Sequence, residues 1–304
     1  MIAALKLIRI QNLLFIAFIQ LIIKFALFVP FEINTALPLT QFILLIISCM
    51  CIAAAGYIVN DIHDVIIDSV NKPEKQIVGI LMPEKTAFNY FVIFNVIGVG
   101  IGFYLANYIG KPSFAGLFIG ISALLYLYAT YIKSIVILKN IIIGILSAMA
   151  LIIVGLFELF PMINDDSQST LKTIFSIITD YALFAFALTL IRELVKDIED
   201  TDGDKNGEIQ TLPILIGRKR AGKIAFVLGV FTTAGVVYYV YKYLYLHQLA
   251  ILYFLLLVIA PLLYFCIKIF SAEKKSEYAK LSILLKAVMF LGMLSMVLYP
   301  FILK

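Results

Sequence analysis

The sequence predicts an all-α protein, a polytopic membrane bundle of nine transmembrane helices. Hydrophobic residues make up 63% of the 304 residues and charged residues 14%, against about 45–50% and about 25% in soluble proteins. A soluble chain of this length could not bury so much apolar surface, so lipid must surround most of it. The apolar residues also form runs of about 20, the length of a membrane-crossing helix. These observations exclude a secreted disulfide scaffold, a nucleic-acid-binding domain and a disordered tail.

Nine apolar windows follow one another along the chain, and short connectors alternate with longer ones. The predicted spans are 12–31, 39–59, 86–106, 113–131, 135–157, 172–192, 221–241, 248–268 and 281–302. The connectors 60–85 and 193–220 are the longest and the most polar. Because no internal repeat or low-complexity segment is visible, we expect a single integral membrane domain, 1–304.

The basic residues are distributed unevenly over the connectors. With the N-terminus in the cytoplasm, 18 of the 24 Lys and Arg fall in inner segments and 4 in outer segments. This bias agrees with the positive-inside rule. It predicts a cytoplasmic N-terminus, a C-terminus outside and an integral membrane protein of a prokaryotic plasma membrane.

The cysteines and the net charge indicate neither zinc nor nucleic acid. Cys49, Cys51 and Cys266 all lie in apolar runs, and a Cys-x-Cys pair without further Cys or His nearby is a poor zinc signature. We expect them to be small apolar side chains within helices. The net charge of +5 accompanies no basic stripe with interleaved aromatic residues outside the spans.

Acidic residues are concentrated in the two polar connectors, which hold 12 of the 19 Asp and Glu. In the first connector, Asn60, Asp61, Asp64 and Asp68 directly follow the second span. At about 100° per residue these four residues share one face if the helix continues, as the apolar run 65–67 suggests.

In the second connector, Glu193, Asp197, Asp200 and Asp204 form a helical stripe about 60° wide. Carboxylates four residues apart repel each other, and the cost rises near a membrane unless a cation neutralises them. A solvated acidic loop is the alternative interpretation. Two clusters with the same spacing on the same side of the membrane favour a functional site.

The donor atoms of both clusters suit a hard divalent cation and not zinc, because all of them are oxygens. An EF-hand is excluded by the spacing. Mg2+ takes one or two carboxylates and completes its octahedron with water and phosphate oxygens. Two carboxylate stripes therefore predict a clamp for Mg2+ ions that bridge a diphosphate. Basic residues at inner helix ends could reach the phosphate, although positive-inside anchoring is the alternative for each: Arg9, Lys72, Lys133 and Lys196.

Two motifs and two shorter segments carry a resemblance to a known family. The first motif is Asn60-Asp61-x-x-Asp64-x-x-x-Asp68, followed by Asn71-Lys72-Pro73. The second is Asp200-x-x-x-Asp204, followed by Gly207, Thr211-Leu212-Pro213 and Gly217. The shorter segments are Arg9-x-x-Asn12, in which Ile10 replaces the usual proline, and Tyr131-Ile132-Lys133. Together they resemble the UbiA superfamily of intramembrane prenyltransferases, from residue 9 to about residue 222.

The resemblance implies a UbiA-like fold and a Mg2+-dependent transfer of an isoprenoid chain from its diphosphate to an acceptor. The implied metal ligands are Asn60, Asp61, Asp64, Asp68, Asp197, Asp200 and Asp204. The implied diphosphate-binding residues are Arg9, Asn12, Lys72, Lys133 and Lys196. The implied catalytic residues are Asp64, Asp68, Asp200, Asp204 and Tyr131. Tyr131 would stabilise positive charge at the allylic carbon, with hydrogen bonding or packing as the alternative.

Within the superfamily, the segment 192–200 is most similar to the geranylgeranylglycerol-phosphate geranylgeranyltransferase branch, which makes ether lipids. This similarity predicts a prenyl diphosphate, a small-molecule acceptor and membrane lipid as partners, and no nucleic acid. A prenyltransferase acting on an aromatic quinone precursor or a tetrapyrrole stays open. A cation-coupled membrane transporter is the alternative from another class, although its acids would lie near span centres rather than at span ends.

Some polar residues keep more than one interpretation. Lys24, Asp180 and Lys286 lie inside predicted spans. Asp180 could pair with a lysine across helices, or these side chains could extend to an interface. His63 lies within the first motif, where a metal role and a solvent-facing position are both open.

Overall fold

The computed structural model describes residues 2–65, 69, 74, 76–206 and 210–302. These residues form helices and connectors without a strand, and nine of the helices are long and apolar enough to cross a membrane. They are Ile10–Phe28, Leu39–His63, Glu84–Tyr108, Pro112–Thr130, Leu138–Met162, Gln168–Lys205, Arg218–Leu244, Gln248–Ser271 and Lys275–Ile302. Each predicted span corresponds to one of them, so the predicted fold class and number of spans are confirmed for this part of the chain.

The sixth span is much longer than expected. Helix α8 (Gln168–Asn206) continues beyond the predicted end at residue 192 and carries the second acidic motif. Leu194, Val195 and Ile198 are buried in the apolar core. Burial of this apolar stripe compensates for the repulsion between the acids on the other faces.

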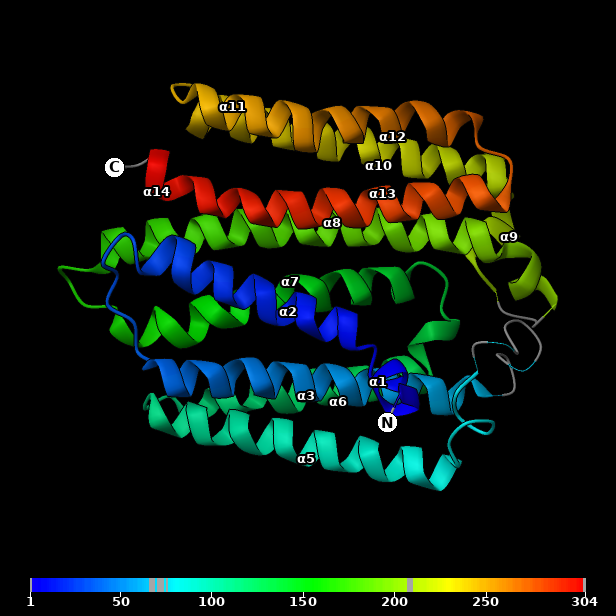
Figure 1. The fold of residues 1–304 in the computed structure, drawn as a ribbon, viewed down its shortest axis with the longest axis horizontal. Helices are drawn as coiled ribbons and strands as arrows, with labels where there is room; N and C mark the ends of the chain where they lie inside the picture. The colour runs from blue at the N-terminus through cyan, green and yellow to red at the C-terminus, as the bar shows by residue number, and fades with distance from the viewer. Residues whose placement is uncertain (1, 66–68, 70–73, 75, 207–209, 303–304) are drawn as a thin grey trace. The chain divides into compact units, whose positions relative to one another are not determined.

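The chain folds into two compact units (Figure 1). Unit 1 consists of Met1–Leu21, Ile33–Ile135 and Ala150–Ser176, and unit 2 consists of Ile22–Glu32, Val136–Met149 and Ile177–Lys304. Helices α2 (Ile10–Ile22), α7 (Leu138–Glu158) and α8 therefore contribute residues to both units.

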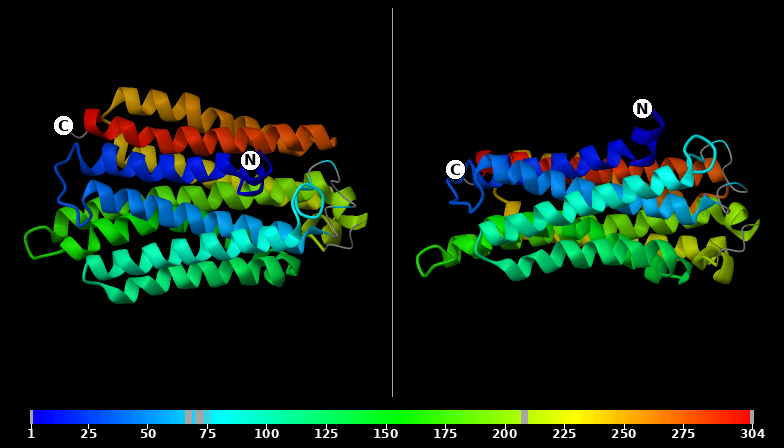
Figure 2. Two further views of the ribbon diagram at one scale, coloured as in Figure 1. Left: turned by 60° about the horizontal axis from the view of Figure 1, so that its bottom comes forward. Right: turned by 90° about the horizontal axis from the view of Figure 1, so that it is seen from below.

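Unit 1 is built around α3 (Leu39–His63), which packs against α5 (Glu84–Tyr108) and α6 (Ala115–Thr130). Figures 1 and 2 both show α3 and α5 side by side. A Cβ atom at Gly98 would lie 2.7 Å from the Ile52 side chain, so glycine is needed for this close approach. The Ser48 hydroxyl donates a hydrogen bond to the Gly98 carbonyl at 2.6 Å. Small residues and an interhelical hydrogen bond are typical of helix pairs in membranes.

One end of unit 1 is closed by α1 (Ile2–Leu7) and the segment 76–82. Side chains of both pack in a buried cluster with the last turns of α3: Leu7, Ile58, Ile77, Val78, Met82 and Ala87. The Gln76 amide donates hydrogen bonds to the carbonyls of Val65 and Val78, at 3.2 and 3.0 Å. The cluster fixes the end of α3, where the first acidic motif begins. The remaining short elements are η3 (Pro112–Phe114), η4 (Ile132–Ser134) and η5 (Phe160–Met162).

Unit 2 packs α8 with α10 (Arg218–Tyr239), α12 (Ala260–Ser271) and α13 (Lys275–Leu294) around one apolar core. Gly217 connects α9 (Leu212–Ile216) to α10 with φ of +86°, a conformation that glycine adopts without strain. It turns the chain from the short helix directly into the next span. The remaining elements are η1 (Ile23–Phe28), η6 (Val240–Leu244), α11 (Gln248–Phe254), η7 (Leu255–Ile259), η8 (Ser295–Leu298) and α14 (Tyr299–Ile302).

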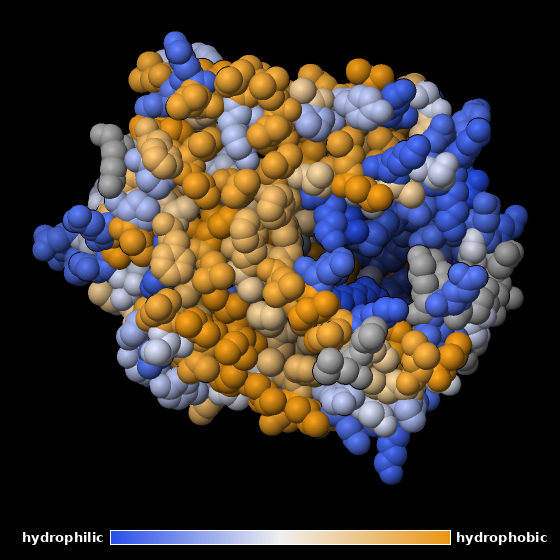
Figure 3. Space-filling view, viewed as in Figure 1, coloured by the Kyte–Doolittle hydropathy of each residue, from blue (hydrophilic) through white to orange (hydrophobic). Residues whose placement is uncertain are grey.

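The surface carries the pattern of a membrane protein. In Figure 3, hydrophobic residues cover the middle of the face shown, and hydrophilic residues are concentrated toward the helix ends. Large apolar side chains such as Phe231, Leu249 and Phe301 are more than 70% exposed. Exposure of this kind fits side chains that face lipid. The three cysteines are free thiols inside α3 and α12, as expected.

Candidate functional site

The first acidic motif lies at the C-terminal end of α3. Asn60 and Asp61 belong to the last turn, and Asp64 is the C-cap residue, whose N–H donates to the Asn60 carbonyl at 2.9 Å. A helix continuing through Asp68 was expected; α3 ends at His63, Asp64 forms a turn with φ −94° and ψ 0°, and Val65 and Ser69 are again helical. Asp68 and Lys72 lie outside the described residues.

Both described acids of this motif hold cations from distant parts of the chain. Arg9 Nη2 lies 2.9 Å from Asp61 Oδ1, and Lys133 Nζ lies 2.5 Å from Asp64 Oδ1. The second Asp64 oxygen accepts a hydrogen bond from Asn60 Nδ2 at 2.6 Å. Residues that the sequence placed in three separate segments therefore meet at one end of unit 1.

These contacts are partly sheltered from solvent. The side chains of Asp61 and Asp64 are 17% and 21% exposed, so their charges interact more strongly than they would in bulk water. The Arg9 guanidinium also lies 4.9 Å above the Tyr57 ring centroid, a favourable cation–π contact. Two cations predicted to bind diphosphate thus neutralise the two acids predicted to bind metal.

Arg9 occupies a sharp break between α1 and α2. It has φ of +50°, and its carbonyl accepts the Asn12 N–H at 2.8 Å. Asn12 therefore lies in the first turn of α2, next to Arg9. Its predicted contact with diphosphate stays a prediction.

Tyr131 and His63 flank this site on exposed positions. Tyr131 is the C-cap residue of α6 and its side chain is 66% exposed, which speaks against a packing role. The Tyr131 carbonyl accepts the Ser134 hydroxyl at 2.7 Å, in the short helix that carries Lys133. His63 is exposed, with its ring centroid 6.3 Å from that of Tyr126. The predicted role of Tyr131 at the allylic carbon stays a prediction.

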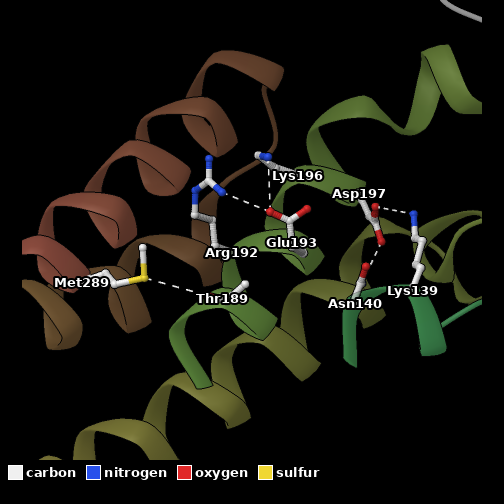
Figure 4. A network of polar contacts seen from close by, with 8 residues as sticks. All are labelled: Lys139, Asn140, Thr189, Arg192, Glu193, Lys196, Asp197 and Met289. Atoms are coloured by element: carbon white, nitrogen blue, oxygen red, sulfur yellow. Dashed lines mark hydrogen bonds and ion pairs between the residues drawn. The ribbon is translucent and has the colours of Figure 1, made fainter. Parts of the chain in front are cut away.

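The acidic stripe of the second connector, which includes the second motif, lies within the continuous helix α8. Its first two acids, Glu193 and Asp197, contact different partners (Figure 4). Glu193 lies 3.1 Å from Arg192 and 3.3 Å from Lys196. Asp197 is 9% exposed. Its two oxygens contact Lys139 Nζ at 2.7 Å and Asn140 Nδ2 at 2.9 Å. Asp197 therefore joins α8 to the beginning of α7.

The later acids of this motif are less buried. Asp200 lies 3.7 Å from Lys275 Nζ at the start of α13. Asp202 pairs with Arg218 at 2.7 Å and its side chain is 82% exposed. Asp204 is partly exposed near the end of α8. The helical register used to predict the stripe is correct, but Asp197 and Asp200 pair with cations on different helices.

Lys139, Asn140 and Lys275 were missed as site residues from the sequence. Lys139 and Lys275 were counted only as inner-face charges, and Asn140 was not considered. One feature of the sequence could have indicated them: Lys139 and Asn140 are polar residues at the start of an apolar span, where helix formation does not require a polar side chain. Without a contact map, no residue pattern connects this pair to Asp197.

The oxygen donors fit Mg2+ on chemical grounds. Among the described residues, no three His, Cys, Asp or Glu side chains gather closely enough to hold a metal by themselves. Mg2+ does not require such a cage, because it binds one or two carboxylates and fills its other positions with water and phosphate oxygens. The first motif offers Asp61, Asp64 and an amide oxygen of Asn60, and the second offers Asp200 and Asp204.

Comparison with known proteins gives a consistent result. The family model described as the UbiA prenyltransferase family matches residues 21–294. The digeranylgeranylglyceryl phosphate synthase of Sulfolobus acidocaldarius is 34% identical over 194 residues, which are 64% of this chain and 63% of that protein. The protein of the same name from Korarchaeum cryptofilum is 29% identical over 264 residues, which are 84% of this chain and 86% of that protein.

Solved structures with the same fold cover nearly the whole chain. One, from work on the biosynthesis of digeranylgeranylglyceryl phosphate synthase in membranes, has a TM-score of 0.68 at 22% identity and covers 98% of this chain and 97% of that chain. A UbiA homolog from Archaeoglobus fulgidus, bound to DMAPP and Mg2+, has a TM-score of 0.57 at 17% identity and covers 94% of this chain and 97% of that chain. At these identities the similarity establishes the fold.

Proposed function

Since the chain belongs to the UbiA prenyltransferase family, we propose that it transfers a geranylgeranyl group from its diphosphate to a glycerol-phosphate ether lipid precursor. The predicted superfamily, the UbiA-like fold and the prenyltransferase class of enzyme are confirmed by the family match and the structural neighbours. The alternative of a cation-coupled transporter has no support in either comparison.

The proposed acceptor is inferred from the name that the relatives share. The Sulfolobus and Korarchaeum proteins are both digeranylgeranylglyceryl phosphate synthases. A product with two geranylgeranyl groups on glyceryl phosphate requires an acceptor that already carries one. This observation favours the ether-lipid acceptor over an aromatic quinone precursor or a tetrapyrrole.

Mg2+ is the proposed cofactor, in agreement with the Archaeoglobus homolog bound to GPP and Mg2+. Asn60, Asp64 and Asp68 would hold one ion, and Asp200 and Asp204 the other. Bound Mg2+ would supply positive charge to the diphosphate as the allylic C–O bond breaks. Asp197 is a weaker candidate as a ligand, because its side chain is buried and both of its oxygens are bonded to Lys139 and Asn140.

The cations of the chain would stabilise the departing diphosphate. Lys133 and Arg9 lie beside the first motif, each in contact with one of its acids, and would move to the diphosphate when Mg2+ binds those acids. Positive charge beside the leaving oxygen stabilises the negative charge that develops on it. Tyr131, two residues before Lys133, presents an exposed ring at the same end of α6, where it could stabilise the allylic cation.

The test is a transfer assay with purified protein in lipid. Geranylgeranyl diphosphate is supplied with one of three acceptors: geranylgeranylglyceryl phosphate, an aromatic quinone precursor or a tetrapyrrole. We expect rapid transfer to the glycerol phosphate and its loss when a chelator removes Mg2+, with recovery on readdition. Preferential transfer to either other acceptor would overturn the choice of acceptor while leaving the enzyme class intact.

The protein is integral to the membrane, since it has nine apolar spans within the described residues and belongs to a family of membrane prenyltransferases. The bias of Lys and Arg supports a cytoplasmic N-terminus and an outer C-terminus in a prokaryotic plasma membrane. Labelling of single cysteines introduced near each end with a membrane-impermeant maleimide tests this orientation. Labelling of the N-terminal cysteine in intact cells would contradict it.

A further inference from the structure

Unit 2 contains a cavity far from the acidic motif on the same helix. The cavity has a volume of about 360 Å3 and is lined by residues of α8, α10, η6, α11 and α13. Asp180 marks its position on α8 and lies 20 residues before Asp200, so the two are about 30 Å apart along the helix. In Figure 1, α11 lies at one end of unit 2 and α9 lies at the other. The cavity therefore belongs to the opposite membrane face from the second motif.

The wall of the cavity is apolar and contains space that the protein does not fill. Leu183, Phe184, Val236 and Phe254 contribute hydrocarbon surface. A Cβ atom added at Gly235 would meet no atom within 4 Å, although Gly235 lines the cavity. The neighbouring lining residue Gly292 differs, since a Cβ there would lie 2.3 Å from the Phe184 ring. Gly292 makes room for a protein side chain, whereas Gly235 leaves open volume.

The charged groups of the cavity are one acid and one base, and Thr232, Tyr238 and Tyr243 also line it. Asp180 and Lys242 both line the cavity. Lys242 Nζ lies 4.7 Å from the Tyr243 ring centroid and 5.8 Å from the Tyr238 ring centroid. A carboxylate within a membrane span is costly and marks a functional position by default. It also accepts up to about four hydrogen bonds, more than one ammonium can donate.

Two of the tyrosines that line the cavity, Tyr181 and Tyr239, already use their hydroxyls within the protein. The Tyr181 hydroxyl bonds to the Ser295 hydroxyl at 2.6 Å, and the Tyr239 hydroxyl bonds to the Tyr299 hydroxyl. Asp180 and Lys242 are the charged residues that a ligand in the cavity would meet. Because their charges cancel, the site offers a hydrogen-bond acceptor and a donor without net charge.

From these features we infer that the cavity is a second lipid site, which binds an uncharged amphiphile with one hydrocarbon chain and a hydroxyl head. The chain lies against Phe184 and Val236 beside Gly235. The hydroxyl donates its hydrogen bond to Asp180 and accepts one from Lys242. An anionic head would be attracted by Lys242 and repelled by Asp180, so the pair selects against phosphate. No diphosphate chemistry is involved, and the site is independent of the proposed transfer reaction.

The test uses a photoreactive hexadecanol with a diazirine in its chain, added to the protein in phosphatidylcholine nanodiscs. Mass spectrometry then locates the labelled peptides, with hexadecanol, hexadecane and hexadecyl phosphate as competitors. We expect labels near Phe184 and Val236. We also expect hexadecanol to compete about fivefold better than hexadecane, the factor that one hydrogen bond is worth.

Two variants separate the cavity from general contact with lipid. Gly235→Leu fills the open volume and should abolish labelling of these helices. Gly120→Leu is the matched control, because a Cβ at Gly120 in α6 also meets no atom within 4 Å but lies outside the cavity. It should label like the wild type. Asp180→Asn leaves Lys242 unopposed and should make hexadecyl phosphate the better competitor.

Equal labelling of Gly235→Leu and wild type would overturn the site. Equal competition by hexadecane and hexadecanol would overturn the role of Asp180 and Lys242 in head recognition. Labels spread evenly over lipid-facing helices would show adhesion without a site, and would also overturn the inference. A transfer assay on the same samples reports the proposed enzymatic function separately, so neither result depends on the other.

Discussion

The two acidic motifs are alike in composition but are held in different ways. The first lies where a helix ends, and its acids are paired with Arg9 and Lys133, which come from connectors. The second lies inside a continuous helix, and its most buried acid is paired with Lys139 and Asn140 at the start of another span. Cations in connectors can exchange partners when substrate arrives, whereas Lys139 and Asn140 belong to the packed interior. The difference separates acids suited to ligand exchange from acids that maintain helix packing.

The largest effect should come from removing one acid of each motif. Asp64→Ala and Asp200→Ala should each lower the rate of prenyl transfer by about a hundredfold or more, the usual cost of losing a group that stabilises transition-state charge. Asp202→Ala is the control on the same helix, because its side chain is 82% exposed. It should stay near the wild-type rate in the same assay. Near-normal transfer by Asp64→Ala or Asp200→Ala would remove that motif from the site.

The next effect should come from Lys133. Its ammonium lies 2.5 Å from Asp64 Oδ1. A divalent ion bound by Asp64 would have to displace this ammonium. Lys133→Met should therefore tighten binding of Mn2+, a spin-active substitute for Mg2+, in the absence of diphosphate, while it slows transfer. Electron paramagnetic resonance titration measures the free ion. Lys133→Arg keeps the charge and should bind Mn2+ like the wild type, and equal affinity in all three proteins would contradict partner exchange.

Asp197 should affect stability more than chemistry. Asp197→Ala leaves the Lys139 ammonium, only 12% exposed, without its carboxylate, which should cost about 3 kcal/mol of unfolding free energy. The double variant Asp197→Ala/Lys139→Met removes both charges and should recover part of the loss. Thermal unfolding in detergent measures both variants. A stable Asp197→Ala protein with weakened metal binding would instead return Asp197 to the predicted metal ligands.

The smallest effect should come from the Arg9–Asp61 pair. The Arg9 side chain is 45% exposed, and exposed pairs contribute less than about 1 kcal/mol. Asp61→Asn should therefore change the unfolding midpoint little. A large loss of stability in the same thermal assay would show that the pair holds α1 against α3.

The spans and the family could be read from the sequence, because each depends on local composition or on motif spacing. Apolar runs of bilayer length predict helices without knowledge of their neighbours. The pairing of Asp64 with Lys133, 69 residues away in the chain, could not be predicted, because it depends on how distant segments pack. The pairing of Asp197 with Lys139 and Asn140 was missed for the same reason. The roles of individual acids at the metal stay predictions.

The length of α8 sets how far the second acidic motif lies from the other end of the helix. Its 39 residues rise about 58 Å, nearly twice the thickness of a hydrocarbon core of about 30 Å. The helix therefore extends well beyond the hydrocarbon core, and the predicted ligands Asp200 and Asp204 lie near its C-terminal end. A substrate held in the bilayer by its isoprenoid tail presents its diphosphate outside that core as well. Substrates of different chain length can then reach the same acids, because the tail extends toward the bilayer centre and leaves the position of the head unchanged.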